Sequence, residues 1–257
     1  MEQASPNNSP LRESAKDITQ SVAVFIDEKF PRITPNQLTM ARAVAALGVS
    51  ALLAKTESPK VKFAGALGYT LFELADAVDG NLARIKAERN GEETKLNGNL
   101  IDALSDKAVE SAACYLIAER SIRNGDKIGA AVNILAGITA PLPALFRARA
   151  EKHNLVVKES SYGTRPIRSA LTGLDLVFGG NRVTSQILGA TLAGMNSTTT
   201  IRRMGAVRNP DSKEVVGELN NDRKRLESRL RYPALAVFSL GSLAVGLKML
   251  DRAGRLD

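Results

Sequence analysis

Four aspartates lie in two pairs between residues 76 and 106, and both pairs have helical spacing. Asp76 and Asp79 are three residues apart, and Asp102 and Asp106 are four residues apart. On a helix, either spacing places the two partners on one face, a turn apart. The flanking residues are mostly apolar, and carboxylates gathered in apolar surroundings are costly unless a cation neutralises them. The pattern therefore predicts a divalent metal site where two helices meet.

The ligand chemistry of this site is restricted by the composition of the chain. His153 is the only histidine and Cys114 the only cysteine, which excludes a His-ligated metal, a thiolate zinc site and an internal disulfide. We expect His153 to be a polar loop residue. Oxygen-only ligands favour hard cations, so we expect one or two ions of Mg²⁺ or Mn²⁺. The competing interpretation is an amphipathic helical hairpin whose acids face water.

The aspartates also belong to a longer motif. It reads Asp76-Ala-Val-Asp79-Gly80-Asn-Leu-Ala83-Arg84 and, after thirteen residues, Gly98-Asn-Leu-Ile-Asp102-Ala-Leu-Ser-Asp106. Its order and spacing resemble the signature of the CDP-alcohol phosphatidyltransferases, which are integral membrane enzymes of phospholipid synthesis. The family usually has a shorter gap between the two halves. We expect the extra residues, 88–94, to form a polar loop on the solvent side.

The resemblance implies a CDP-diacylglycerol donor, an alcohol acceptor and CMP as the leaving group. It implies a metal held by Asp76, Asp79 and Asp102, with Asp106 as the general base for the acceptor hydroxyl and as a further contact to metal. Donor binding is expected at Asp79, Gly80, Ala83, Arg84 and Gly98.

Each of these assignments has a competing explanation. Helix–helix packing would also account for the small residues Gly80 and Ala83, and a solvated salt bridge would account for Arg84. Lys107 either balances charge at the site or pairs with an acid such as Glu110.

A second group of basic residues bears on the acceptor. Three segments resemble basic elements of the phosphatidylinositol-phosphate synthase branch: Leu145-Phe-Arg147-Ala-Arg149-Ala-Glu151, Tyr162-Gly-Thr-Arg165-Pro166-Ile-Arg168 and Thr200-Ile-Arg202-Arg203. In that branch such residues bind the phosphate of inositol phosphate, which implies this role for Arg147, Arg165 and Arg202. Arg147 stands where a lysine is usual. Guanidinium groups suit phosphate because they donate two parallel hydrogen bonds.

The identity of the acceptor stays open at this level. Inositol phosphate is favoured, and glycerol 3-phosphate is the rival within the family. The three arginines could also be ordinary positive residues at cytoplasmic helix ends. A different class, a non-catalytic helical membrane protein with a cation site, is disfavoured because binding alone has less need of Asp106.

The net charge limits the classes of partner that are expected, and the mean hydropathy bears on whether the protein is a membrane protein. The net charge of +8 suits anionic lipid headgroups or phosphorylated substrates. Nucleic acid is not an expected partner, since no recognition motif is present and aromatic residues make up only 4% of the chain. The mean hydropathy of −0.09 is low for a polytopic membrane protein, and a soluble helical protein is the alternative it supports. Residues 1–12 lack the apolar core of a signal peptide.

The expected fold is all-α, a polytopic membrane bundle of about six transmembrane helices with an N-terminal interfacial helix. Residues 1–14 are expected to be disordered, 15–32 to form the amphipathic helix, 33–205 to form the membrane domain and 206–257 to form a charged region with one more apolar helix. No segment alternates as a strand would. The apolar helical segments are 38–54, 61–80, 98–119, 128–146, 167–179, 183–201 and 233–250.

Details of individual segments add to this expectation. Thr34 is a predicted N-cap, with Pro35 at the first helical position. The apolar stripe of residues 15–30 would lie on the membrane surface or pack on a partner helix. Segment 233–250 would be a seventh span, an interfacial helix or a cap on the bundle. Basic residues in 147–168 and 202–232 place the active site weakly on the cytoplasmic face of the plasma membrane. A homodimer is left open.

Overall fold

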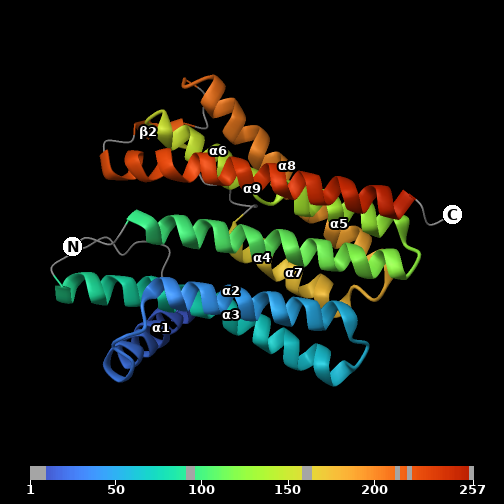
Figure 1. Ribbon diagram of the computed structural model, residues 1–257, viewed down its shortest axis with the longest axis horizontal. Helices are drawn as coiled ribbons and strands as arrows, with labels where there is room; N and C mark the ends of the chain where they lie inside the picture. Colours follow the sequence, from blue (N-terminus) through green and yellow to red (C-terminus); the bar gives the residue numbers. More distant parts are fainter. Residues whose placement is uncertain (1–9, 91–95, 158–163, 212–214, 219–221, 255–257) are drawn as a thin grey trace.

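The computed structural model describes residues 10–90, 96–157, 164–211, 215–218 and 222–254. Across these ranges the chain forms a helical bundle and a small two-stranded ribbon, and most helices run side by side along the long axis (Figure 1). The predicted helical membrane fold is confirmed. The helices are α1 (Pro10–Lys29), α2 (Pro35–Lys55), α3 (Pro59–Asn90), α4 (Leu96–Arg123), α5 (Lys127–Thr139), α6 (Leu142–Lys152), α7 (Arg165–Phe178), α8 (Arg182–Arg208) and α9 (Asp222–Gly254).

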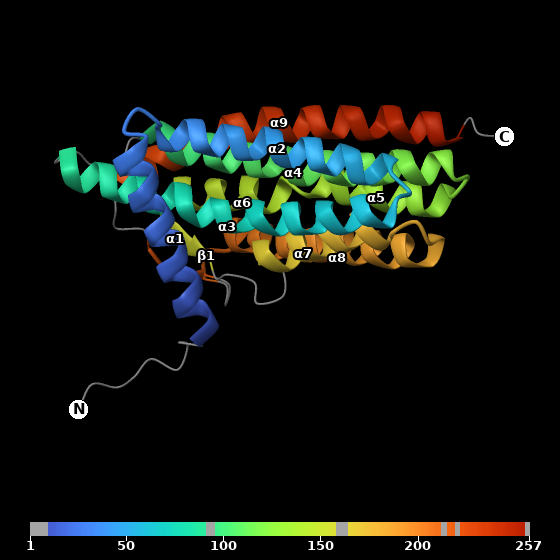
Figure 2. The same cartoon turned by 90° about the horizontal axis from the view of Figure 1, so that it is seen from below.

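Three helical stretches of the described chain are long and apolar enough to cross a membrane. They are Pro35–Lys55, Lys127–Lys152 and Arg229–Gly254. The count of about six spans stays a prediction. The apolar run 233–250 lies within α9, which packs along α4, α5 and α6 and runs the length of the bundle in both views (Figures 1 and 2). Its length and packing fit the seventh-span alternative.

The start of α2 follows the predicted capping pattern. Thr34 Oγ1 accepts a hydrogen bond from the Gln37 N–H at 3.2 Å, and the Gln37 side chain accepts one from the Thr34 N–H at 2.9 Å. This reciprocal capping box satisfies two backbone donors that the first helical turn leaves without partners. Pro35 occupies the first turn, where its missing N–H costs nothing. The predicted N-cap is confirmed.

The expected segment 128–146 is divided into two helices. Pro141 separates α5 from α6, because proline has no N–H to donate to the carbonyl four residues earlier, at Gly137. That carbonyl instead accepts a hydrogen bond from Ser242 Oγ on α9, at 3.1 Å. The interruption in one helix thus becomes an attachment point for another.

Two short strands were not foreseen. β1 (Leu155–Val157) pairs antiparallel with β2 (Val215–Glu218), with Leu155 opposite Glu218 and Val156 opposite Gly217. Strands of three and four residues are too short to show a reliable alternation of polar and apolar side chains. Their pairing joins the segment after α6 to the segment after α8, and so depends on the folded bundle.

The first and third helices are longer than expected. α1 begins at Pro10, so residues 10–14 are helical where disorder was expected; residues 1–9 lie outside the described part. Proline at a first helical position is favourable, since its fixed φ suits the helix. α3 continues to Asn90, which makes residues 88–90 helical rather than loop, and the remainder of the expected insertion, 91–94, lies outside the described residues.

α1 packs on α3 with one face and exposes another. Ala23 is fully buried beside Val78 and Leu82, and Asn81 Nδ2 donates to Thr19 Oγ1 at 3.2 Å. The predicted apolar stripe lies on the exposed face of α1, because Phe25 and most of the other residues of this stripe are exposed. α1 crosses the direction of the bundle (Figure 2). Packing on a partner helix is therefore observed, and the apolar stripe remains available to a membrane surface.

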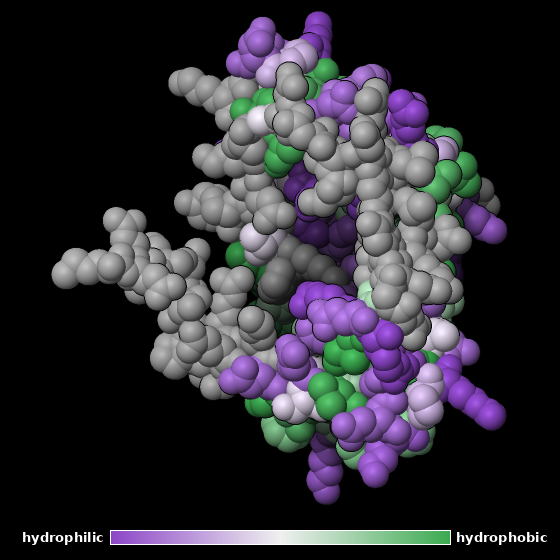
Figure 3. Space-filling view, turned by 90° about the vertical axis from the view of Figure 1, so that its left-hand side faces the viewer, coloured by the Kyte–Doolittle hydropathy of each residue, from purple (hydrophilic) through white to green (hydrophobic). Residues whose placement is uncertain are grey.

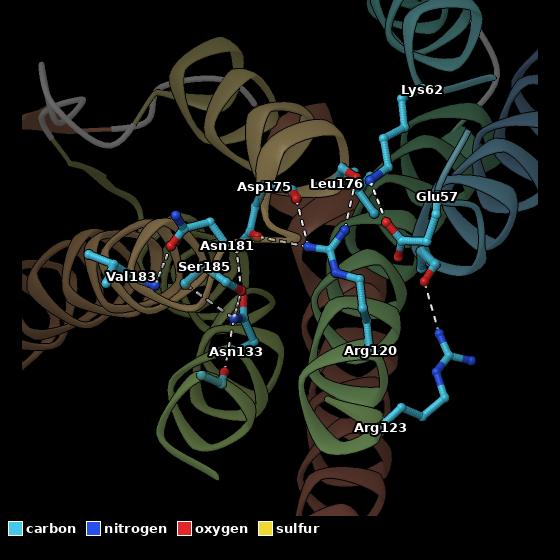
Figure 4. A network of polar contacts seen from close by, with 12 residues as sticks. Glu57, Lys62, Arg120, Arg123, Asn133, Asp175, Leu176, Asn181, Val183 and Ser185 are labelled. Atoms are coloured by element: carbon cyan, nitrogen blue, oxygen red, sulfur yellow. Dashed lines mark hydrogen bonds and ion pairs between the residues drawn. The ribbon is translucent and has the colours of Figure 1, made fainter. Parts of the chain in front are cut away.

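A buried polar network joins four helices near the C-terminal end of α4 (Figure 4). Arg120 is 3% exposed and Asp175 is fully buried; Arg120 Nη2 donates to Asp175 Oδ1 at 3.1 Å, and Nη1 donates to the Leu176 carbonyl at 3.0 Å. Ser185 Oγ lies 3.4 Å from Asp175 Oδ2, and Asn133 Nδ2 donates to Ser185 Oγ at 3.2 Å. The network ties α4, α5, α7 and α8 together at the end of the bundle away from the signature.

We expect Arg120→Ala to destabilise the protein by about 3–5 kcal/mol, because it leaves the Asp175 carboxylate buried without its cation. Arg123→Ala, on the same helix, is the matched control. The Arg123 side chain is 42% exposed and donates one hydrogen bond to the neutral Ala54 carbonyl, so its loss leaves no buried charge unpaired and should cost only about 1 kcal/mol. Thermal unfolding in detergent measures both. Equal melting temperatures for the two variants would contradict the stabilising role of the network.

Candidate active site

The two aspartate pairs meet where α3 and α4 pack against α2. Asp76 and Asp79 lie on α3, and Asp102 and Asp106 lie near the start of α4. One carboxylate oxygen from each of Asp76, Asp79 and Asp102 lies within 4.8 Å of the other two. We name the four aspartates the acid cradle. Figure 3 looks onto the end of the bundle where α3 ends and α4 begins, and hydrophilic side chains are visible inside a recess there.

A guanidinium group from α2 lies among the four carboxylates. Arg42 Nη1 is 2.9 Å from Asp76 Oδ1, and Nη2 is 2.8 Å from Asp106 Oδ1 and 3.4 Å from Asp102 Oδ1. Its Nε is 3.8 Å from Asp79 Oδ2. The Arg42 side chain is only 7% exposed. All four acids converge on this positive charge, which the competing interpretation of water-facing acids does not require. The Asp79 and Asp106 side chains are largely buried, whereas the Asp102 side chain is 44% exposed.

Arg42 was not among the predicted site residues, although the sequence carries a signal for it. It is the only charged residue between Pro35 and Lys55, in a helix that is mostly apolar. A charge inside such a helix is costly, so it marks a functional position with a partner in the bundle. Reading α2 for isolated charges would have found it.

Thr39, one turn before Arg42, supports the same cradle. Its hydroxyl lies 2.8 Å from Asp79 Oδ2 and is buried with it. A hydrogen bond to a carboxylate holds the side chain in one orientation. α2 thus contributes both a cation and a hydroxyl to the acids of α3 and α4.

A small cavity opens beside Asp106. Arg42, Asp106 and Glu110 are its charged lining residues, and Tyr69 and Phe72 are its aromatic ones. The Asp106 side chain is 12% exposed. A carboxylate at the edge of a cavity is placed to meet a small polar group that enters it.

A second ion cluster lies next to this cavity. Lys107 Nζ donates to Glu110 Oε2, which confirms the acid proposed as its partner. Arg168 Nε, from α7, donates to the other oxygen of Glu110 at 2.7 Å. Arg168 was quoted within a motif but was given no role. It lies one turn after Arg165, so its ion pair anchors the start of α7 to α4.

The predicted donor-binding residues differ in their surroundings. A Cβ added at Gly80 would meet no atom within 4 Å, so helix packing does not require a glycine there. Ala83 is half-buried, and Arg84 is exposed, with its Nη1 donating to Asn81 Oδ1 at 3.1 Å. Gly98 lies in the first turn of α4. The open space at Gly80 favours ligand binding over packing as the reason for its small size.

The three predicted acceptor residues lie on three helices. Arg147, on α6, is 51% exposed and its Nε donates to Glu151 Oε1 at 3.0 Å. Arg202 is an exposed residue of α8, and Arg165 is the first residue of α7. Arg203 Nη1 donates to the Pro143 carbonyl and joins α8 to α6. The joint role of the three arginines stays a prediction.

The model of the CDP-alcohol phosphatidyltransferase family matches residues 32–194, which is more than half of the chain and includes the acid cradle and Arg42. The chain belongs to the CDP-alcohol phosphatidyltransferase family. It is therefore an enzyme of phospholipid synthesis, as the signature indicated. No match was found among curated protein sequences.

Solved structures of one bacterial enzyme have a similar fold. Phosphatidylinositol phosphate synthase (PgsA1) from Mycobacterium tuberculosis, with CDP-DAG bound, has a TM-score of 0.61 and 23% identity, covering 80% of this chain and 98% of that one. Its apo form has a TM-score of 0.59 and 23% identity, with 74% and 97% covered. Its complex with manganese and citrate has a TM-score of 0.58 and 20% identity, with 79% and 92% covered.

The acid cradle of this phosphatidyltransferase suits a divalent metal. The converging atoms of Asp76, Asp79 and Asp102 are all oxygens, as hard cations prefer, and they lie close enough to share one ion. Asp79 is buried and accepts a hydrogen bond from Thr39, which holds its carboxylate in one orientation. The position of Arg42 shows that this group of acids accommodates a cation.

We expect Asp79→Asn to weaken Mn²⁺ binding by at least about tenfold, because even second-shell changes commonly cost 10–100-fold. Titration of the purified enzyme with Mn²⁺, followed by the electron paramagnetic resonance signal of the free ion, measures the affinity. Asp17→Asn, which changes an exposed acid of α1, is the control and should bind as the unmodified enzyme does. Catalysis should stop in excess chelator. Full activity in chelator would contradict the metal site.

Proposed function

We propose that this enzyme transfers the phosphatidyl group of CDP-diacylglycerol to a phosphorylated polyol and releases CMP. Inositol phosphate is the favoured acceptor, and glycerol 3-phosphate is the alternative. The observation that carries the proposal is the convergence of Asp76, Asp79 and Asp102, with Asp106 beside them at a cavity.

The four aspartates of the acid cradle have two different roles in this reaction. Asp76, Asp79 and Asp102 would hold one or two ions of Mg²⁺ or Mn²⁺. Bound metal supplies positive charge to the pyrophosphate oxygens and to the departing CMP. Asp106 takes the proton of the acceptor hydroxyl. The hydroxyl oxygen bonds to the phosphorus that carries diacylglycerol, and the bond from that phosphorus to the CMP oxygen breaks.

The cytidine end of the donor would lie along α3. Gly80 leaves open space on this helix, Ala83 is small one turn further, and Arg84 offers an exposed guanidinium. Gly98 would continue this surface at the start of α4. A flat nucleotide needs a helix face without side chains in its way, and Gly80 meets that need.

Gly80→Val should raise the KM for the donor roughly tenfold or more, since a misplaced substrate loses rate steeply. Its stability should change little, because the new side chain enters open space. Gly194→Val is the matched control, as a Cβ there also meets nothing within 4 Å but lies on α8, outside the signature. Steady-state CMP release and thermal unfolding distinguish the two variants. A large loss of stability at Gly80, or equal donor KM values, would contradict donor binding.

The phosphate of the acceptor needs its own positive partners. A phosphate monoester carries about two negative charges near pH 7, beyond those of the donor. Arg147, Arg165 and Arg202 come from three helices, which suits a pocket closed around a small polar molecule. The ion pair between Arg168 and Glu110 holds the start of α7 beside the cavity and so supports the position of Arg165. The fold likeness to a phosphatidylinositol phosphate synthase agrees with this choice.

Arg165→Ala and Arg202→Ala should each raise the acceptor KM far more than the donor KM, with a loss of roughly 1.5–3 kcal/mol per charge-assisted contact. Arg149→Ala changes an exposed arginine two residues after Arg147 and is the control.

Asp106→Asn should retain donor binding but stop turnover. The assay is CMP release from labelled CDP-diacylglycerol with inositol phosphate, glycerol 3-phosphate, free inositol or serine.

The choice of acceptor would be wrong if free inositol or serine turned over faster than both phosphorylated polyols. It would also be wrong if the arginine variants changed donor binding only. Faster turnover with glycerol 3-phosphate than with inositol phosphate would select the alternative acceptor. The family chemistry rests on the aspartates and does not depend on this choice.

The same proposal covers location. We propose a multi-pass protein of the plasma membrane whose acid cradle faces the cytoplasm, where soluble phosphorylated acceptors occur. α1 crosses the bundle direction and exposes its apolar stripe, as a helix in the membrane interface would.

A further inference from the structure

Arg42 connects all three helices of the active site. Its Nη1 contacts Asp76 on α3 at 2.9 Å, and its Nη2 contacts Asp106 on α4 at 2.8 Å, while the residue itself belongs to α2. Nη2 also lies 3.4 Å from Asp102. A planar guanidinium with donors at both ends can bridge acids in this way, whereas a lysine offers one point charge.

The cradle would be unstable without a cation. Four carboxylates in a partly buried space repel one another, and their loss of water makes each charge more costly. Arg42 is almost fully buried among them, so water screens its attraction for the acids only weakly. Its single positive charge offsets part of the repulsion and holds α3 and α4 near their final positions.

We propose that Arg42 is a resident counter-ion that keeps the acid cradle assembled before metal binds and gives up its contacts to Asp76 and Asp102 when metal enters. The inference rests on the metal site of the proposed function. It adds a role to Arg42 as a positioning residue, one that acts through the aspartates, and it makes the arginine and the metal competitors for the same oxygens.

Competition follows from the distances. A bound Mg²⁺ or Mn²⁺ ion lies about 2.0–2.2 Å from its oxygen ligands. Asp76 Oδ1 already has a guanidinium nitrogen at 2.9 Å, and Asp102 Oδ1 has one at 3.4 Å. Two positive groups at one oxygen repel each other, so a metal bound at these oxygens weakens their contacts to the N–H groups and favours the loss of those contacts. Because binding free energies are linked, removing Arg42 should tighten metal binding.

Arg42 keeps a carboxylate partner after its guanidinium leaves Asp76 and Asp102. Arg42 lies deep in α2 with little exposed surface, so it cannot move out to bulk water without moving the helix. It stays beside the cavity that it lines with Asp106. Its contact to Asp106 is not among those that the metal takes, so Arg42 keeps this partner when the contacts to Asp76 and Asp102 are lost.

The test compares the unmodified enzyme with Arg42→Gln and Arg42→Lys, all purified in detergent and stripped of metal. Mn²⁺ affinity without donor is measured from the free-ion signal, and the melting temperature is measured with and without Mn²⁺. Arg252→Gln removes an exposed charge at the end of α9 and is the control for net charge.

We expect Arg42→Gln to bind Mn²⁺ tighter by about fivefold or more, the usual lower range of coupling between two sites. Its melting temperature should fall without metal and recover with Mn²⁺, giving a larger metal-induced rise than in the unmodified enzyme. Arg42→Lys keeps the positive charge but loses the planar guanidinium with donors at both ends. Its Mn²⁺ affinity and its metal-induced rise in melting temperature should therefore lie between those of the unmodified enzyme and of Arg42→Gln. Folding of Arg42→Gln only in the presence of Mn²⁺ would support the same conclusion.

Unchanged or weaker Mn²⁺ affinity in both Arg42 variants would overturn the inference about Arg42. If the unmodified enzyme still bound Mn²⁺ in that experiment, the proposed function would stand. Absence of Mn²⁺ binding in the unmodified enzyme would instead overturn the metal site itself. The two failures are therefore separable within one titration series.

Discussion

The packing of α2, α3 and α4 depends on compensating the repulsion among four carboxylates. α3 and α4 bring these carboxylates into one small space. Such a cluster persists only with positive charge inside it, and Arg42 provides that charge from α2. This requirement explains why an apolar helix carries one arginine and why Thr39 faces Asp79. The packing of these three helices and the electrostatics of the cradle are one constraint, because neither the acids nor the arginine is stable when buried alone.

The two ends of α4 handle buried charge in different ways. Near its end, one guanidinium faces one carboxylate, because Arg120 pairs with Asp175, and further hydrogen bonds of the pair reach Leu176 and Ser185. Near its start, one guanidinium faces four acids, which leaves excess negative charge beside a cavity. The first arrangement stabilises the bundle, and the second has capacity for a further cation.

The ion cluster beside the cavity is centred on Glu110. This acid accepts hydrogen bonds from Lys107 on its own helix and from Arg168 on α7, and so links α4 to the segment that begins with Arg165. The cavity lies between this cluster and Arg42. A shift of α7 would therefore change the lining of the cavity that Asp106 also lines.

The sequence by itself determined the family, the acid motif and the helical fold, because fixed spacings on helices and capping residues such as Thr34 act locally. It also carried Arg42 as an isolated charge, although the partners of that charge were not readable. Tertiary structure alone decided what depends on distant segments: the convergence of α2 on the cradle, the Arg168–Glu110 pair, the open space at Gly80 and the β1–β2 ribbon. Spacing along the chain reports which residues share a helix face, whereas the partner of a buried charge is set by the packing of separate helices.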